Sequence, residues 1–136
     1  MKTLVLPVGL PRSGKSTWAK AQGCPVVNPD AIRMVLHGTA YRSEAEAMVW
    51  AIAHTMVESL FEAGHDRVIL DACNVSPRRR DEWRSKKWRT EYALFRTSPE
   101  VCKERARTNG QDYLLAVIDR MNKDLVWPTE NLIEVL

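Results

Sequence analysis

The stretch Gly9-Leu10-Pro11-Arg12-Ser13-Gly14-Lys15-Ser16 matches the pattern G-x-x-x-x-G-K-[ST]. It follows a short apolar run at residues 2–8 and opens a segment, 15–22, whose composition suits a helix. Glycine permits a tight turn in which several backbone N–H groups point inward, and the helix adds the positive end of its dipole. Such a loop cradles phosphate groups. The pattern therefore predicts a phosphate-binding loop between a strand and a helix.

The lysine and serine of this loop, together with one later aspartate, have distinct expected roles. Lys15 can reach the β- and γ-phosphates of ATP, and the Ser16 hydroxyl can ligate Mg²⁺. Asp71 follows an apolar run, 68–70, that is typical of a strand buried on both faces. Its carboxylate can then hold Mg²⁺ at the edge of the sheet, and the alternative is a cap or turn aspartate. The residues expected to contact ATP are Gly9, Pro11, Arg12, Ser13, Gly14, Lys15, Ser16 and Thr17.

Apolar runs alternate with helical patterns along the chain. The expected strands lie at 2–8, 25–28, 68–70, 92–96 and 132–136, and the expected helices at 15–22, 31–37, 43–63, 76–89, 98–108 and 114–125. This alternation predicts a three-layer α/β fold with a parallel sheet of about five strands, the P-loop NTPase fold. Residues 1–136 then form one domain with a small helical lid at about 103–115. Pro7 is disfavoured in a central strand, so the first strand either ends at Leu6 or carries a bulge.

Two of the expected helices have recognisable starts. Asp30 is a natural N-cap for the helix at 31–37. Ser43 and Glu46 have the spacing of a capping box, which begins the helix at 43–63. In this long helix we expect the core-facing stripe to be formed by Met48, Ile52, Met56 and Leu60.

Composition narrows the class of protein. The 136 residues are 45% hydrophobic and 27% charged, which is typical of one globular domain. No apolar run approaches the roughly 20 residues that span a bilayer. The three cysteines are an odd number without a Cys-x-x-Cys pair, which argues against a disulfide scaffold or a structural zinc site. We expect a reduced, cytoplasmic protein that does not enter a membrane.

A basic run at residues 78–89 has seven basic and two acidic residues, a local excess of positive charge larger than the net charge of +3 of the whole chain. Such a run suits an anionic partner, and a solvated helix surface is an equally good interpretation. Trp83 and Trp88 lie in it, but residues five apart cannot share one helical face, so we expect Trp83 in the core. Trp18, Trp50 and Trp127 are expected to be core residues or pocket walls.

Several blocks of the sequence, in order, resemble the kinase domain of bacteriophage-type 5′-hydroxyl polynucleotide kinase. These blocks are 9–19, 28–33 (Asn-Pro-Asp-Ala-Ile-Arg), 70–79 (Leu-Asp-Ala-Cys-Asn-Val-Ser-Pro-Arg-Arg), 102–105 and 117–121. The resemblance implies transfer of the γ-phosphate of ATP, with Mg²⁺, to a hydroxyl of a nucleic acid or nucleotide. It also implies a possible homo-oligomer.

The same resemblance assigns roles to three further residues and leaves a fourth open. Asp30 would accept the proton of the attacking hydroxyl, and Arg33 would hold the 3′-phosphate of the acceptor. The alternatives are that Asp30 only caps its helix and that Arg33 only forms a surface ion pair. Arg105 matches the first lid arginine of the family. The second falls on Asn109, which is a departure: either Arg107 replaces it, or Lys103 and Arg107 form the pair.

Two departures leave the acceptor open. Arg12 stands where the family usually has glycine, and Pro29 replaces a basic residue before the catalytic aspartate. The alternatives are therefore a kinase of the same fold that acts on a nucleoside, sugar or modified base, and a nucleotide-binding ATPase or switch that acts through a partner protein.

Overall fold

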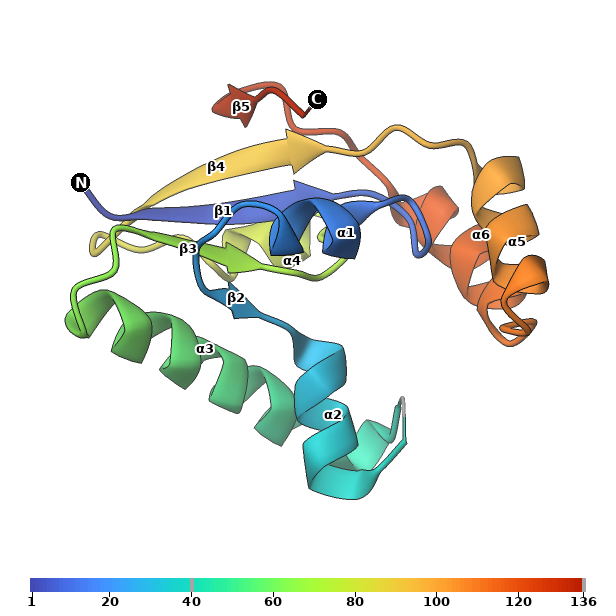
Figure 1. The fold of residues 1–136 in the computed structure, drawn as a ribbon, viewed down its shortest axis with the longest axis horizontal. Coiled ribbons are helices and arrows are strands. Elements are labelled where there is room, and N and C mark those ends of the chain that lie inside the picture. Colours follow the sequence, from blue (N-terminus) through green and yellow to red (C-terminus); the bar gives the residue numbers. More distant parts are fainter. Residues whose placement is uncertain (40, 136) are drawn as a thin grey trace.

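Residues 1–39 and 41–135 are described by a computed structural model, which contains a five-stranded sheet (Figure 1). Its strands are β1 Thr3–Val8, β2 Val26–Val27, β3 Arg67–Leu70, β4 Arg89–Leu94 and β5 Leu132–Ile133. Their order is β2-β3-β1-β4-β5, and every neighbouring pair is parallel. The predicted parallel α/β sheet is confirmed. Leu136, the end of the last expected strand, lies outside the described residues.

In the part of the chain that the structure describes, six α-helices connect the strands. They are α1 Lys15–Lys20, α2 Pro29–His37, α3 Glu46–Glu62, α4 Pro77–Asp81, α5 Pro99–Thr108 and α6 Leu114–Asp124. In Figure 1, α1 lies in front of the sheet and α4 behind it, while α5 and α6 lie beyond the carboxyl ends of β1 and β4. Across residues 1–39 and 41–135, none of the helices combines the length and apolar character that crossing a bilayer requires.

Two apolar clusters cover the two faces of the sheet. The larger cluster joins Leu4 and Leu6 of β1 to the inner face of α3 and to Trp83 and Trp88. On the other face, Val5 packs with Ala19 of α1 and with apolar residues of β3 and β4. Alternate residues of β1 therefore point into opposite layers, as the two-residue period of a strand requires.

The inner face of α3 differs from the expected stripe. The buried residues are Val49, Ala53, Val57 and Phe61, with Ile52 and Leu60 partly buried beside them. The prediction that Met48 and Met56 lie in the core is wrong, because these residues are 60% and 38% exposed. Apolar residues surround most of this helix, so their periodicity alone could not choose between adjacent faces.

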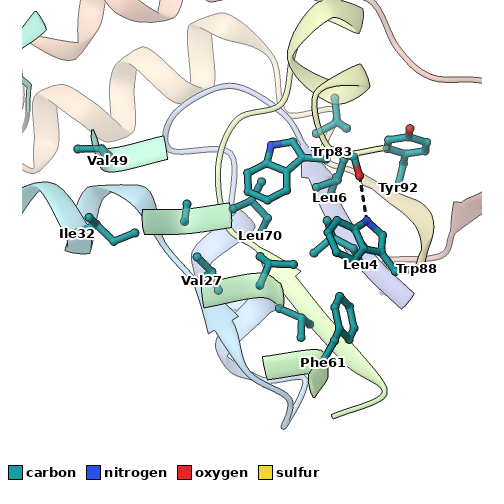
Figure 2. Packing of buried hydrophobic residues seen from close by; sticks show 14 residues of the cluster. Leu4, Leu6, Val27, Ile32, Val49, Phe61, Leu70, Trp83, Trp88 and Tyr92 are labelled. Atoms are coloured by element: carbon teal, nitrogen blue, oxygen red, sulfur yellow. Dashed lines mark hydrogen bonds between the residues drawn. The ribbon is translucent and has the colours of Figure 1, made fainter. Parts of the chain in front are cut away.

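The basic run does not form one helix. The helix α4 ends at Asp81, and the chain then turns before β4 begins at Arg89. Both Trp83 and Trp88 are buried, and the indole Nε1 of Trp88 donates to the carbonyl of Trp83 at 2.9 Å (Figure 2). The core position of Trp83 is confirmed. Trp18, Trp50 and Trp127 pack partly buried against the two clusters.

Pro7 lies inside the central strand without a bulge. Odd-numbered residues of β1 direct their N–H groups toward β3, since Thr3 donates to Asp66 and Gly9 donates to Cys73. By the same register an N–H at position 7 would face the carbonyl of Leu70, the last residue of β3, but that carbonyl accepts from the Ala72 N–H at 3.0 Å instead. The Pro7 carbonyl accepts from the side chain of Asn74 at 2.8 Å.

The α5–α6 hairpin has a small core of its own at the carboxyl edge of the sheet. Cys102 and Ala106 of α5 pack on Ile118 of α6 and on Leu10 of the phosphate loop. Lys103 also pairs with Asp119 across the two helices. The hairpin includes the segment predicted as a lid, and it packs against the phosphate loop through Leu10.

Candidate active site

The phosphate loop is fixed to the ends of two strands. The Gly9 N–H donates to the Cys73 carbonyl, which follows β3, and the Thr97 hydroxyl, which follows β4, donates to the Ser13 carbonyl at 3.0 Å. A Cβ atom on Gly9 would lie 2.8 Å from the carbonyl oxygen of Phe95 and 2.7 Å from the Ser13 hydroxyl. The first glycine of the motif is therefore required by close packing of the loop against β4.

Two loop residues adopt the left-handed conformation, Gly14 with φ 105° and Arg12 with φ 68°. This conformation costs a side-chain-bearing residue about 1–2 kcal/mol relative to glycine. This conformational cost is a physical reason why the resembling family usually has glycine where this chain has Arg12. The Arg12 carbonyl accepts a hydrogen bond from Arg105 at 3.0 Å, which connects the loop to α5.

Lys15 is buried within the loop. Its Nζ donates to the Leu10 carbonyl at 2.6 Å and to the Ser13 hydroxyl at 3.3 Å. A pocket of about 320 Å³ opens beside it. Three cations and no carboxylate are found among the described residues that line this pocket, which suits a polyphosphate. The lining residues are Arg12, Gly14, Lys15, Ser16, Thr17 and Arg105.

Of the predicted contact residues, Gly9, Pro11 and Ser13 belong to the loop but do not line the pocket. Gly9 and Ser13 instead shape the loop through the strand contacts described above. The Ser13 hydroxyl also holds Lys15 in place.

Asp71 and Ser16 meet beside the pocket. The Ser16 hydroxyl donates to Asp71 Oδ2 at 2.7 Å, although the two residues are 55 positions apart. Asp71 is buried, and Asn28 also donates to its Oδ2 at 3.3 Å. A hydroxyl and a carboxylate are the hard oxygen donors that Mg²⁺ prefers, so this pair fits the ion. In the part of the chain that the structure describes, no cluster of three or more His, Cys, Asp or Glu side chains offers another metal site.

Cys73 lies next to this charged centre. Burial raises the pKa of its thiol, and this effect exceeds the opposing influence of Lys15. The thiol is therefore neutral at physiological pH, and the positive charge of Lys15 is not cancelled by a thiolate.

Asn28, not Asp30, caps helix α2. The Asn28 side-chain oxygen accepts from the N–H groups of Asp30 and Ala31 at 2.8 and 3.3 Å, while its amide donates to Asp71. The predicted cap is wrong because the helix begins two residues earlier than expected, at Pro29, and proline is well suited to the first helical position. The Asp30 carboxylate is consequently free of the cap and 78% exposed.

An ion-pair network positions Asp30. Arg33 Nη1 donates to Asp30 Oδ1 at 2.6 Å. The other edge of the guanidinium forms a bidentate pair with Glu46, with Nε–Oε2 at 2.9 Å and Nη2–Oε1 at 2.7 Å. Three of the five N–H groups of Arg33 are therefore used by carboxylates. The Arg33 and Glu46 side chains are only 13% and 18% exposed.

This pairing shifts the pKa values of both partners. The hydrogen bonds from Arg33 lower the pKa of Glu46, and the bond to Glu46 raises that of Arg33, each against the effect of burial. Both groups are thus charged at neutral pH. Glu46 does not complete the expected capping box, because Ser43–Ala45 forms a 3₁₀ turn and α3 has no side-chain cap.

The candidate lid cations have different partners. Arg105 lines the phosphate pocket. Arg107 pairs with Glu104 on its own helix at 3.4 Å, and Lys103 pairs with Asp119. Asn109 caps the end of α5 and donates to the Arg105 carbonyl at 2.7 Å. The structure brings Arg105, but neither Arg107 nor Lys103, to the pocket.

Sequence reasoning gave no site role to Asn28, Glu46 or Arg79. Asn28 can both cap α2 and donate to Asp71 because it lies between β2 and the proline that starts α2. Glu46 was identified by its spacing from Ser43, and nothing local in the sequence connects it to Arg33. Arg79 was one of several arginines in the basic run.

The sheet order and the loop define a class of protein. A parallel sheet ordered β2-β3-β1-β4-β5, with the phosphate loop between the central strand and α1, is the fold of the nucleotide-binding P-loop kinases. Residues 4–126 match the sequence model of the family described as AAA domain. The chain belongs to this family.

Several solved structures share the fold. A sugar kinase from Janibacter sp. HTCC2649 has a TM-score of 0.69 at 17% identity, covering 99% of this chain and 85% of its own. The APS kinase CysC of Mycobacterium tuberculosis, in complex with AMPPNP and APS, has a TM-score of 0.62 at 14% identity, covering 98% and 88%. A chain of the Pnkp1/Rnl/Hen1 complex has a TM-score of 0.60 at 25% identity. That match covers 76% of this chain but only 38% of the other.

Proposed function

We propose that this protein is an ATP-dependent phosphotransferase that moves the γ-phosphate to the 5′-hydroxyl of a polynucleotide or nucleotide. One observation carries the proposal. Asn28 donates to Asp71 beside the phosphate pocket and also caps the helix on which Asp30 and Arg33 lie. A single residue thus connects the proposed metal site to the proposed catalytic carboxylate.

In the proposed reaction, the acceptor hydroxyl oxygen attacks the γ-phosphorus, the bond from that phosphorus to the β–γ bridging oxygen breaks, and ADP leaves. Asp30 takes the proton of the hydroxyl, since its exposed carboxylate is held in one orientation by Arg33. Lys15 and Arg105 balance the charge that develops on the transferring group. Arg107 is the second lid candidate, and it would have to leave Glu104 to take part.

The remaining groups bind the substrates. Mg²⁺, held by Ser16 and Asp71, would neutralise charge on the β- and γ-phosphates. Arg33 would contact the 3′-phosphate of the acceptor through the two N–H groups that Asp30 and Glu46 leave free. The 25% identity to a chain of the Pnkp1/Rnl/Hen1 complex, which is described as an RNA repair complex, supports a polynucleotide acceptor. A homo-oligomer and a cytoplasmic location remain part of the proposal.

A kinase of a small molecule is the second candidate. The sugar kinase and the APS kinase match nearly the whole of this chain and most of their own lengths, whereas the Pnkp1 match spans little more than a third of the other chain. The likeness to these two kinases along nearly the whole chain is the observation that favours a small-molecule acceptor.

Label transfer from γ-labelled ATP distinguishes these functions. The acceptors are a 5′-hydroxyl oligonucleotide, a nucleoside 3′-monophosphate, and a set of nucleosides and sugars, each with Mg²⁺. We expect label on the oligonucleotide and a loss of about 10²–10⁴-fold with Asp30→Asn, which removes the base. Asp66→Asn is the matched control, because this exposed aspartate precedes β3 at the opposite edge of the sheet.

Other outcomes assign other functions. If label reaches only a nucleoside or a sugar, the protein is a kinase, and a polynucleotide is not its acceptor. Release of phosphate alone, equal in wild type and Asp30→Asn, would indicate an ATPase or switch and would contradict the assignment of Asp30.

A further inference from the structure

The three consecutive arginines of α4 have three different environments. Arg80 is buried, donates from Nη1 to the carbonyls of Asn74 and Val75, and lies over the ring of Tyr92. Arg78 is exposed. Arg79 lies over the ring of Trp50, with its Cζ 4.6 Å from the ring centroid. Successive helical residues differ by about 100°, so only one arginine of the three can face α3.

Trp50 connects Arg79 to the ion-pair network of Asp30. The Arg33 Cζ lies 5.8 Å from the centroid of the same ring. Trp50 is also four residues after Glu46 and therefore on the same face of α3. Its edge-to-face contact with buried Trp83, at 6.5 Å and 62°, fixes the ring against the core. Side chains from α2, α3 and α4 thus form one surface beside the proposed catalytic carboxylate.

The two guanidiniums on Trp50 differ in how strongly they are already paired. Arg33 has a bidentate carboxylate partner and a second carboxylate, and is nearly buried. Within residues 1–39 and 41–135, the one ion pair of Arg79 is with Glu82 at 3.3 Å, between side chains that are about half exposed. Exposed pairs of this kind contribute little, so Glu82 holds Arg79 weakly. Arg79 is therefore the cation of this surface that can most easily accept an anion.

We propose that Trp50 and Arg79 form a second acceptor subsite, which binds the second phosphodiester from the 5′ end of a polynucleotide. This inference rests on the proposed function. Arg33 would contact the first phosphate and Arg79 the next, with Trp50 holding both guanidiniums in place by cation–π contacts. The planar guanidinium matches a phosphodiester, and its stacking on an indole limits the rotamer entropy lost on binding. The subsite gives the site a preference for a polynucleotide over a mononucleotide.

The test is the ratio of kcat/KM for a 5′-hydroxyl hexanucleotide to that for a nucleoside 3′-monophosphate. We expect Arg79→Ala to lower this ratio about tenfold, because a charged hydrogen bond to the second phosphate is lost. Arg79→Lys, which keeps the charge but not the planar fork, should recover part of it. Arg78→Ala is the matched control on the same helix and should leave the ratio as in wild type.

A binding experiment gives an independent measure. The affinity for a 3′-labelled hexanucleotide, followed by anisotropy at several salt concentrations, should fall in Arg79→Ala. The slope of log K against log[salt] should decrease by about 0.7, the value for one phosphate contact on a single strand. Arg78→Ala should retain the wild-type slope.

The failures of the two proposals are distinguishable. If the wild type labels the hexanucleotide and Arg79→Ala keeps the wild-type ratio and slope, the subsite is wrong and the proposed function stands. If the wild type labels no 5′-hydroxyl on either acceptor, the proposed function is wrong, and the subsite with it.

Discussion

The phosphate loop and the proposed acceptor face are built from different parts of the chain. The loop is one continuous segment, residues 9–16, and its shape depends on backbone contacts to the ends of β3 and β4. The acceptor face consists of Arg33, Glu46, Trp50 and Arg79, which belong to α2, α3 and α4. It is held by side-chain ion pairs and cation–π contacts.

This difference shows which region can change its ligand. Backbone N–H groups can bind phosphate with many different side chains in the loop. The loop therefore tolerates Arg12 where the resembling family usually has glycine. A surface made of side chains changes its recognition when one residue is replaced. A family that binds one nucleotide in the loop can therefore serve many acceptors.

Among the changes that compare these two regions, replacing Lys15 should have the largest effect on phosphate transfer. Lys15→Met removes the buried ammonium from the phosphate pocket, and we expect phosphate transfer to fall about 10²–10³-fold. Oligonucleotide affinity, measured by anisotropy, should remain near that of wild type, because the acceptor face does not contact Lys15. The control is Lys20→Met at the exposed end of α1. A parallel loss of oligonucleotide affinity would contradict the separation.

Replacing Glu46 should disturb the acceptor face and not the phosphate loop. Glu46→Gln leaves the nearly buried Arg33 with a neutral partner, and we expect a loss of about 1–3 kcal/mol in the free energy of unfolding at pH 7. Phosphate transfer should also fall, since Arg33 positions Asp30. The control is Glu58→Gln on the same helix, where an exposed pair with Lys87 should contribute less than about 1 kcal/mol.

The pH dependence of this effect has a defined sign. Arg33 lowers the pKa of Glu46, so the pair stabilises the fold above the usual glutamate pKa of about 4.3 and loses this contribution as the pH falls through the lower, folded-state pKa. The difference in urea midpoint between wild type and Glu46→Gln should thus be constant from pH 8 to about pH 5 and shrink below about pH 4. A difference that persists unchanged at pH 3 would contradict the ion-pair explanation.

Arg12 should give the smallest effect. Arg12→Gly relieves the left-handed conformation, but glycine loses more backbone entropy on folding, so we expect a net gain of at most about 1 kcal/mol in stability. Affinity for ATP should weaken severalfold, because one of the three pocket cations is removed. Thermal unfolding and titration with a fluorescent ATP analogue measure the two changes. Arg12→Lys, which keeps both the charge and the conformational cost, should resemble wild type in both.

The sequence by itself determined the parts of the protein that depend on local backbone geometry. The phosphate loop, the alternating strands and helices, and the parallel sheet follow from glycine placement and hydrophobic periodicity over a few residues. The place of Asp71 at the end of β3 follows in the same way and was confirmed. These features need no knowledge of what lies across the molecule.

Only the tertiary structure decided how the charged side chains are paired. It joined Arg33 to Glu46 across 13 residues and Ser16 to Asp71 across 55, and it turned Arg79 toward Trp50. It also ended α4 at Asp81, and the irregular segment that follows places both Trp83 and Trp88 in the core. Long side chains reach many partners at similar energy, and the packing of the helices on the sheet selects one of them.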